Sequence, residues 1–248
     1  MTPNADPPIP PEITGAELDR DVRAQLSSLS KETATAVAAH LVAAGQLIDE
    51  DPEQAWAHAV AARRRAARIG VVREAAGLTA YRSGRYADAL AELRTARRLT
   101  GSSVHLPVMA DAERGLGRPD RALELASGPE ASTLDRAGRI ELLIVAAGAR
   151  HDLGQPEAAV VTLQVPELRA KGQAPWLARL RFAYAEALEA VGRHEEAARW
   201  HELAREADPD GLAGITPEVD ADDVLVVDLL EDGDAEDDHN DPVGRRPQ

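Results

Sequence analysis

The chain has 248 residues, no cysteine and a formal net charge of −15. Without cysteine it has neither disulfides nor a thiolate zinc site. No apolar run approaches the roughly 20 residues of a membrane span, and the start does not resemble a leader peptide. Alanine, leucine, arginine and glutamate dominate while aromatic residues make up 3%. This composition predicts an all-α cytoplasmic protein with a thin core.

The first two segments in chain order precede the helical repeats. Residues 1–13 hold five prolines and show no helical period, so we expect them to be disordered. Thr14 and Glu17 have the spacing of a capping box, which predicts that a helix begins at this point. We therefore expect residues 14–30 to form a capping helix that packs on the first repeat.

A glycine followed five residues later by an alanine recurs four times along the chain. The glycines are Gly84, Gly117, Gly154 and Gly192, at intervals of 33, 37 and 38 residues, and the alanines are Ala89, Ala122, Ala159 and Ala197. Glycine in the left-handed conformation ends a helix, and small residues let two antiparallel helices approach closely. The interval matches a helical hairpin, so the pattern predicts stacked hairpins that bury their faces against their neighbours.

A degenerate fifth copy lies ahead of these four and lacks the glycine. In it, Asp51 and Pro52 have the order of an N-cap and a first-turn proline, with Gln54 at the reciprocal capping position. We expect a helix that begins there and runs to about Ile69. With this copy, the sequence predicts about five helical hairpins over residues 31–210.

The residues around these glycines resemble the tetratricopeptide repeat (TPR). The clearest copy has Gly77, Gly84, Tyr86, Ala89, Leu93 and Ala96 at repeat positions, and the last has Ala185, Gly192, Ala197, Ala204 and Pro209. Arginine greatly outnumbers lysine, as in high-GC genomes, and the chain resembles bacterial, actinobacterial-type members of the family. The resemblance implies a right-handed α-solenoid that acts as a non-catalytic scaffold for a partner of unknown identity.

In that family the first helix of each hairpin lines a concave groove that binds a peptide or protein. Carried over by position, the resemblance assigns to this groove His40, Leu47, Glu74, Tyr81, Arg82, Asp111, Arg114, His151, Asp152, Arg179, Phe182, Glu186 and Glu189. The family members that clamp acidic chaperone tails need lysine, asparagine and arginine at places that hold His40, Ala44, Glu74, Leu78 and Pro107 here. The resemblance therefore does not extend to that clamp.

Catalytic and metal-binding patterns are weak throughout the chain. Residues 115–120 begin like a dinucleotide fingerprint, but the third glycine and the preceding strand are missing. His194 and His201 lie two helical turns apart near two glutamates, which would suit a metal, although their repeat positions favour packing between hairpins. We expect no enzyme activity, no cofactor and no metal.

A basic region covers residues 60–100, which contain ten arginines and only three acidic residues. Its densest part is Arg63, Arg64, Arg65 and Arg68. One interpretation is a solvated outer face, and the alternative is a phosphate-binding stripe of an RNA- or ribosome-associated factor. Against the alternative, the chain has few aromatic side chains for stacking on single-stranded bases.

Residues 211–248 form an acidic tail that we expect to be mostly disordered. Positions 217–248 hold twelve carboxylates against two arginines, so most of the net charge lies there. An apolar segment inside the tail contains Val224, Leu225, Val227, Leu229 and Leu230. Such segments often become ordered on binding. The tail could dock in the chain's own groove, bind a partner, or only keep the protein soluble.

Overall fold

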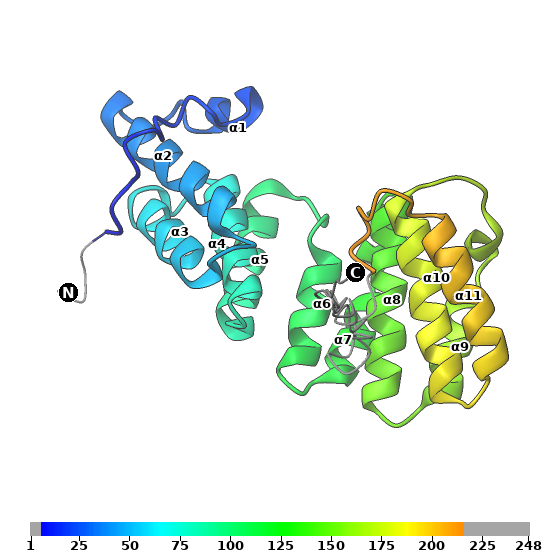
Figure 1. Cartoon of the computed structure of the whole chain (residues 1–248). Helices are drawn as coiled ribbons and strands as arrows, with labels where there is room; N and C mark the ends of the chain where they lie inside the picture. Colours follow the sequence, from blue (N-terminus) through cyan, green and yellow to red (C-terminus); the bar gives the residue numbers. More distant parts are fainter. Residues whose placement is uncertain (1–5, 216–248) are drawn as a thin grey trace, which may run out of the picture. The chain divides into compact units, whose positions relative to one another are not determined.

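The computed structural model describes residues 6–215, and the regular secondary structure of that part of the chain is all helical (Figure 1). The α-helices are α1 (Arg20–Gln25), α2 (Lys31–Leu47), α3 (Pro52–Ala66), α4 (Gly70–Arg82), α5 (Tyr86–Thr100), α6 (Leu106–Gly115), α7 (Pro119–Ala126), α8 (Arg136–Asp152), α9 (Pro156–Leu163), α10 (Pro175–Ala190) and α11 (His194–Glu206). Two short 3₁₀ segments, Pro129–Thr133 and Pro166–Arg169, precede α8 and α10. The predicted all-α fold class is confirmed. No helix within residues 6–215 combines the length and the apolar character needed to cross a membrane.

Ten of these helices form five consecutive pairs, α2–α3, α4–α5, α6–α7, α8–α9 and α10–α11. Each pair packs on the next, because α3 contacts α4, α5 contacts α6, α7 contacts α8, and α9 contacts α10. The first helices of successive pairs also contact one another, from α2 and α4 through to α8 and α10. Residues that face outward from the first helices are therefore neighbours in space although they are far apart in sequence.

The turn inside each of the last four pairs has the same backbone geometry. Gly84, Gly117, Gly154 and Gly192 have φ angles of 72°, 69°, 71° and 76°. In the first of these turns the Gly84 N–H donates to the Tyr81 carbonyl at 3.0 Å, and the Arg85 N–H donates to the Ala80 carbonyl at 2.8 Å. The other three turns repeat both bonds. They satisfy carbonyls at the end of the first helix, as the glycine pattern predicted.

The repeat alanines lie where the helices of a pair approach each other. Ala89, Ala122, Ala159 and Ala197 are exposed by only 0%, 0%, 3% and 0%. At Gly77 in α4 a Cβ would lie 2.5 Å from the side chain of Leu93 in α5. The two helices of a pair can therefore approach this closely only because small residues occupy these positions.

This close contact predicts opposite effects for two glycine-to-alanine changes in first helices. Gly77→Ala is expected to destabilise the protein by about 1–2 kcal/mol, because crowding of Leu93 outweighs the gain in helix propensity. Gly45→Ala, in α2, meets no neighbouring atom within 4 Å and is expected to stabilise by up to about 1 kcal/mol. Urea unfolding followed by circular dichroism measures both. Equal stabilisation by the two changes would contradict tight packing of α4 on α5.

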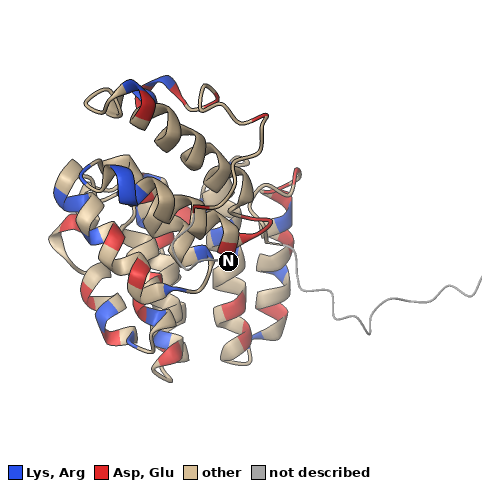
Figure 2. Cartoon of the chain, turned by 90° about the vertical axis from the view of Figure 1, so that its left-hand side faces the viewer, with Lys and Arg blue, Asp and Glu red and all other residues tan. Residues whose placement is uncertain are grey.

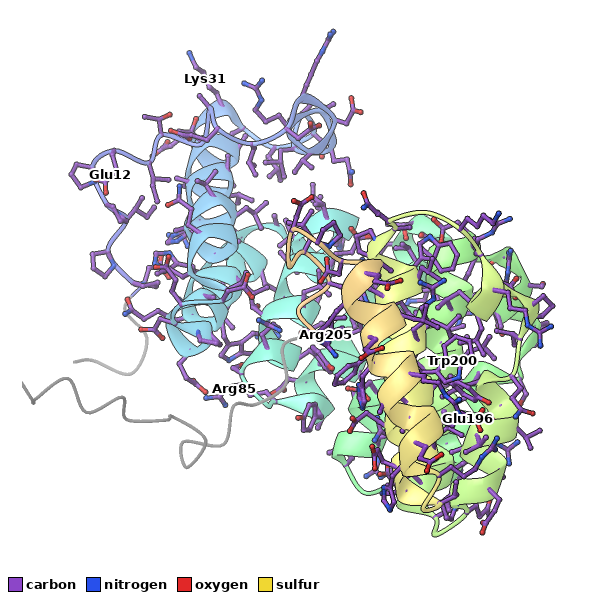
Figure 3. The ribbon with its side chains drawn as sticks, turned by 45° about the vertical axis from the view of Figure 1, so that its right-hand side comes forward. Glu12, Lys31, Arg85, Glu196, Trp200 and Arg205 are labelled. Atoms are coloured by element: carbon purple, nitrogen blue, oxygen red, sulfur yellow. The ribbon has the colours of Figure 1, made fainter. Side chains whose placement is uncertain are left out.

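The core consists of apolar clusters between neighbouring helices. One cluster joins α8, α9, α10 and α11 and includes Ile140, Leu163, Leu180 and Leu188, each 2% exposed or less. Trp200 of α11, labelled in Figure 3, packs edge-on against Tyr184 with ring centroids 5.2 Å apart. This aromatic contact lies within the last pair, whereas the cluster as a whole joins that pair to the preceding one.

The N-terminal segment differs from the prediction of disorder. Residues 6–13 lie along α2, where Ile13 is 8% exposed and packs with Ile9 against apolar side chains of that helix. Asp6 forms ion pairs with both Arg64 and Arg65 of α3. Apolar and charged contacts with the first helix pair hold this segment, and the prolines alone did not reveal them. Residues 1–5 lie outside the described part of the chain.

The predicted capping box is only partly formed. The Thr14 N–H donates to Glu17 Oε1 at 3.1 Å, but Thr14 Oγ1 accepts from the N–H of Ala16 at 3.2 Å instead of that of Glu17. Gly15 takes a positive φ of 83°, so the chain turns there. Helix α1 begins only at Arg20, and the prediction of a helix from residue 14 is wrong.

The predicted start of α3 is confirmed. Asp51 Oδ1 accepts from the Gln54 N–H at 3.0 Å, and Pro52 is the first residue of the helix. The helix ends at Ala66, earlier than the expected end near Ile69. Ile69 instead packs with side chains of α2, α3 and α4.

Candidate partner-binding surface

The predicted groove residues all lie on first helices of the five pairs. His40 and Leu47 are on α2; Glu74, Tyr81 and Arg82 on α4; Asp111 and Arg114 on α6; His151 and Asp152 on α8; Arg179, Phe182, Glu186 and Glu189 on α10. Because these helices contact one another in order, the structure brings most of these residues onto adjoining elements. Most of these residues fall into three groups by their surroundings, and Arg114 belongs to two of the groups.

The first group lines a mainly apolar pocket of about 390 Å³, here called the α8–α10 pocket. Its lining includes four predicted residues, Arg114, His151, Phe182 and Glu186. The other lining residues are apolar or small: Ile144, Ala147, Gly148, Pro156, Ala159, Leu163, Ala183, Ala187 and Ala190. Small residues on α8 and α10 leave the space, and α9 contributes Ala159 and Leu163 from beneath.

The rim of the α8–α10 pocket is polar and mixed in charge. Glu186 is 3.3 Å from Nε2 of His201 on α11, and the ring of His201 packs edge-on to Phe182 with centroids 5.1 Å apart. His151 on α8 is exposed. The pocket can therefore accept an apolar side chain while its rim offers hydrogen-bonding groups to a backbone.

The second group bonds within itself and ties three first helices together. Arg114 donates from Nε to Asp152 Oδ2 at 2.7 Å and from Nη1 to Asp111 Oδ1 at 2.8 Å. The Tyr81 hydroxyl donates to Asp111 Oδ2 at 2.5 Å. Burial, together with this hydrogen bond to a carboxylate, raises the pKa of Tyr81. These four side chains link α4, α6 and α8, so they shape the surface more than they offer free binding groups.

Gly148 on α8 makes room for this network. A Cβ at that position would lie 2.5 Å from Cζ of Arg114. The same glycine lines the α8–α10 pocket. Gly148 was not among the residues predicted from the sequence, because it is neither at a turn nor polar, although small residues spaced along α8 and α10 were the available signal.

Three more groove residues belong to the second group, because each is close to an oppositely charged or ionisable side chain of a neighbouring pair. Arg179 of α10 donates from Nε to Glu141 Oε1 of α8 at 2.7 Å. Arg82 of α4 pairs with Asp49, which follows α2. Glu74 lies 4.0 Å from Nε2 of His105. Most charged positions assigned to the groove therefore have a partner on the neighbouring pair.

His40 forms the third group, because it does not face a groove. Its side chain is 2% exposed and lies between α2 and α3, with Nδ1 at 3.0 Å from Nδ1 of the equally buried His58. One ring must donate its Nδ1–H while the other accepts, so two neutral rings form this contact only in different tautomers. Burial is the main cause that lowers the pKa of His40 to about 4, and it also lowers the pKa of His58.

The basic region is largely neutralised by carboxylates of the same chain. Arg63 and Arg73 bind Glu92; Arg64 and Arg65 bind Asp6; Arg82 binds Asp49; Arg85 binds Glu53; Arg94 binds Glu113; Arg97 binds Glu130. Figure 2 shows blue and red segments interspersed along the helices. Nucleic-acid binding through a continuous basic stripe therefore finds little support among the described residues.

Two further predictions concern histidines and the tail. His194 Nδ1 lies 2.5 Å from Glu189 Oε2, and His201 faces Glu186 and Phe182, so the two rings contact different partners. Within residues 6–215 no group of three His, Cys, Asp or Glu side chains is placed to hold a metal ion. The apolar tail segment, Val224 to Leu230, lies outside the described residues.

Comparison of the chain with models of protein families, with curated proteins and with solved structures gave no match. The structure itself defines the class of protein. Residues 6–215 form an all-α protein of five consecutive helix pairs, with an apolar pocket between the first helices of the last two pairs.

Proposed function

We propose that the protein is a non-catalytic scaffold or adaptor of the TPR-like solenoid type, which binds a partner peptide or protein on its first helices. The four equivalent glycine turns and the contacts between successive first helices support the solenoid arrangement. A cytoplasmic location and a bacterial origin remain predictions from the sequence.

The observation that carries the proposal is the α8–α10 pocket. It opens on the first helices, where the resemblance places the groove, and its floor is apolar. Buried apolar anchors supply much of the affinity in peptide recognition, whereas polar rims mainly orient the ligand. The expected ligand is thus a peptide with a leucine, isoleucine, methionine or phenylalanine that enters the pocket.

The test fills this pocket without disturbing its charged rim. Ala187→Trp places an indole into the pocket lining, and Ala198→Trp adds the same bulk on the exposed face of α11. Peptides are first selected on the full-length protein by phage display, and their affinities are then measured by fluorescence polarisation. We expect Ala187→Trp to weaken binding at least about tenfold, equivalent to about 1.4 kcal/mol, and Ala198→Trp to leave it unchanged.

Two outcomes would contradict the proposal. The first is that the selected peptides bind Ala187→Trp as tightly as the unmodified chain. The second is that no selected peptide contains an apolar anchor. Truncation after Gly214 then tests the acidic tail: tighter peptide binding without the tail would indicate that the tail occupies the same surface, and unchanged binding would assign it another role.

A further inference from the structure

A second cavity, of about 520 Å³, lies where α5, α6 and α7 meet and is lined mainly by charged side chains. The lining residues are Arg94, Glu113, Arg118, Arg121, Glu124 and Leu125. Arg94 belongs to α5, Glu113 to α6, and the others to α7 or the residue that precedes it. Three guanidinium groups thus face two carboxylates, which leaves an excess of one positive charge around the cavity.

Glu113 is the buried member of this group, and only one of its oxygens is hydrogen-bonded. Its side chain is 4% exposed. Oε1 accepts from Nη2 of Arg94 at 2.6 Å, whereas Oε2 is buried and has no hydrogen-bond partner in the described structure. Nη1 of Arg118 lies 3.7 Å from Oε2, beyond hydrogen-bond distance. A buried acceptor without a donor is costly, so this oxygen is suited to a ligand that brings its own proton.

Glu92, the other buried glutamate, shows what a purely structural carboxylate looks like in this fold. Its two oxygens accept from two different arginines, Arg63 of α3 and Arg73 of α4. Glu113 has the corresponding role between α5 and α6 through Arg94 alone. The difference between them is the free oxygen, which lines a cavity together with two more arginines.

Arg118 and Arg121 have guanidinium N–H groups available for an anion. Their side chains are 60% and 66% exposed. Arg121 donates from Nη1 to Glu124 Oε2 at 2.7 Å, which uses one of its five N–H groups. Guanidinium groups bind the oxygens of phosphate and carboxylate well because their planar N–H groups match those oxygens in pairs.

We propose that this cavity binds a phosphate group that carries a proton. The arginines accept the charged oxygens, and the P–OH donates its hydrogen to Glu113 Oε2. A carboxylate inside an arginine-rich anion site discriminates between oxyanions. Phosphate can donate a hydrogen bond to that carboxylate, whereas sulfate has no proton at neutral pH and would place its lone pairs against those of Oε2. The site does not depend on the proposed peptide surface.

The primary test compares inorganic phosphate and sulfate by isothermal titration calorimetry on the full-length protein, at equal ionic strength and pH 7. We expect phosphate to bind at least about tenfold more tightly. A tenfold preference corresponds to about 1.4 kcal/mol, close to the lower value for a hydrogen bond to a charged group. Equal affinity for the two anions, or no heat of binding with either at 10 mM, would overturn the proposal.

Substitutions then assign the selectivity to individual residues. Glu113→Gln keeps the bond from Arg94 and turns an amide NH₂ toward the ligand, so the preference for phosphate should disappear while sulfate binding improves. Arg118→Ala should weaken both anions about tenfold. A Glu113→Gln variant that still prefers phosphate tenfold, with an unchanged circular dichroism spectrum, would show that Glu113 does not accept a hydrogen bond from the phosphate proton.

Arg85→Ala is the matched control. Arg85, labelled in Figure 3, follows the turn glycine of the preceding pair as Arg118 follows Gly117, but it pairs with Glu53 and does not line the cavity. Phosphate affinity should be unchanged in this variant. An equal loss of phosphate affinity in Arg85→Ala and Arg118→Ala would show that the anion responds only to general surface charge. That result would overturn the proposed site.

Binding of methyl phosphate tests whether the phosphate group in the cavity comes from free inorganic phosphate or from a phosphomonoester. Phosphomonoesters lose their last proton near pH 6, whereas inorganic phosphate keeps one well above neutral pH. Methyl phosphate should therefore bind at pH 5.5 and weaken about tenfold by pH 8, while inorganic phosphate is affected much less. If methyl phosphate does not bind at either pH, the cavity is specific for the free anion; pH-independent binding of both would contradict the role of the proton.

Discussion

Replacing Arg63 and Arg73 together by methionine is expected to lower the free energy of unfolding by about 3–5 kcal/mol. Both guanidinium groups bind Glu92, whose side chain is 6% exposed. Without them a carboxylate remains buried among α3, α4 and α5 with no partner, and the cost of its desolvation is no longer offset. Urea unfolding followed by circular dichroism measures the loss.

The triple variant with Glu92→Leu separates charge from packing. It removes the buried carboxylate, so we expect it to recover most of the stability lost in the double variant. The remaining deficit should be about 1 kcal/mol, because Arg63 also stacks on Trp56 with its Cζ 5.6 Å from the ring centroid. If the double variant is as stable as the unmodified chain, the carboxylate is hydrated rather than bound by the arginines.

Acidification from pH 7.5 to 5 is expected to lower the free energy of unfolding by about 2 kcal/mol through His40 alone. Burial lowers the pKa of His40 from 6.5 to about 4. Between these values the unfolded chain binds a proton that the folded chain does not. Stability therefore rises with pH across this window and is lost as the pH falls from about 6.5 toward 4. His58 adds a change in the same direction, because burial lowers its pKa too.

The nearby charged groups do not produce this pH dependence. Pairing with Arg65 and Arg64 lowers the pKa of Asp6 to about 2, so Asp6 stays ionised throughout the window. The double variant His40→Leu/His58→Leu should lose the dependence between pH 7.5 and 5. His194→Gln, at a side chain that is 71% exposed, should retain it. An unchanged slope in the double variant would assign the effect to other groups.

The features that could be predicted from the sequence are local or repeated. Gly84 and its three equivalents fix a helix end through φ angles that favour glycine, and Asp51 caps α3 through atoms three residues apart. Repetition made the helix pairs recognisable although the aromatic content is low. Capping geometry depends on residues a few positions apart, and a repeat of about 35 residues is visible as a spacing along the chain. Both can therefore be recognised in a single sequence.

Part of the candidate surface could also be anticipated. Phe182, His151 and Glu186 were assigned by repeat position, and all three line the α8–α10 pocket. The assignment could not show that Arg114 is engaged by Asp111 and Asp152. Position within a repeat gave the correct helix in each case, but it did not give the face for His40, nor which long side chains reach across to the next pair.

The sequence by itself determined the helix pairs, their turns and the small residues between them, because these depend on backbone conformation and on contacts within one repeat. Only the tertiary structure decided that His40 is buried against His58, that residues 6–13 pack on α2, and that Asp6 and Glu92 neutralise much of the basic region. Asp6 lies 58 residues before Arg64 in the chain. Such contacts depend on which surfaces the folded pairs bring together and on the reach of individual side chains, and neither is encoded in a local pattern.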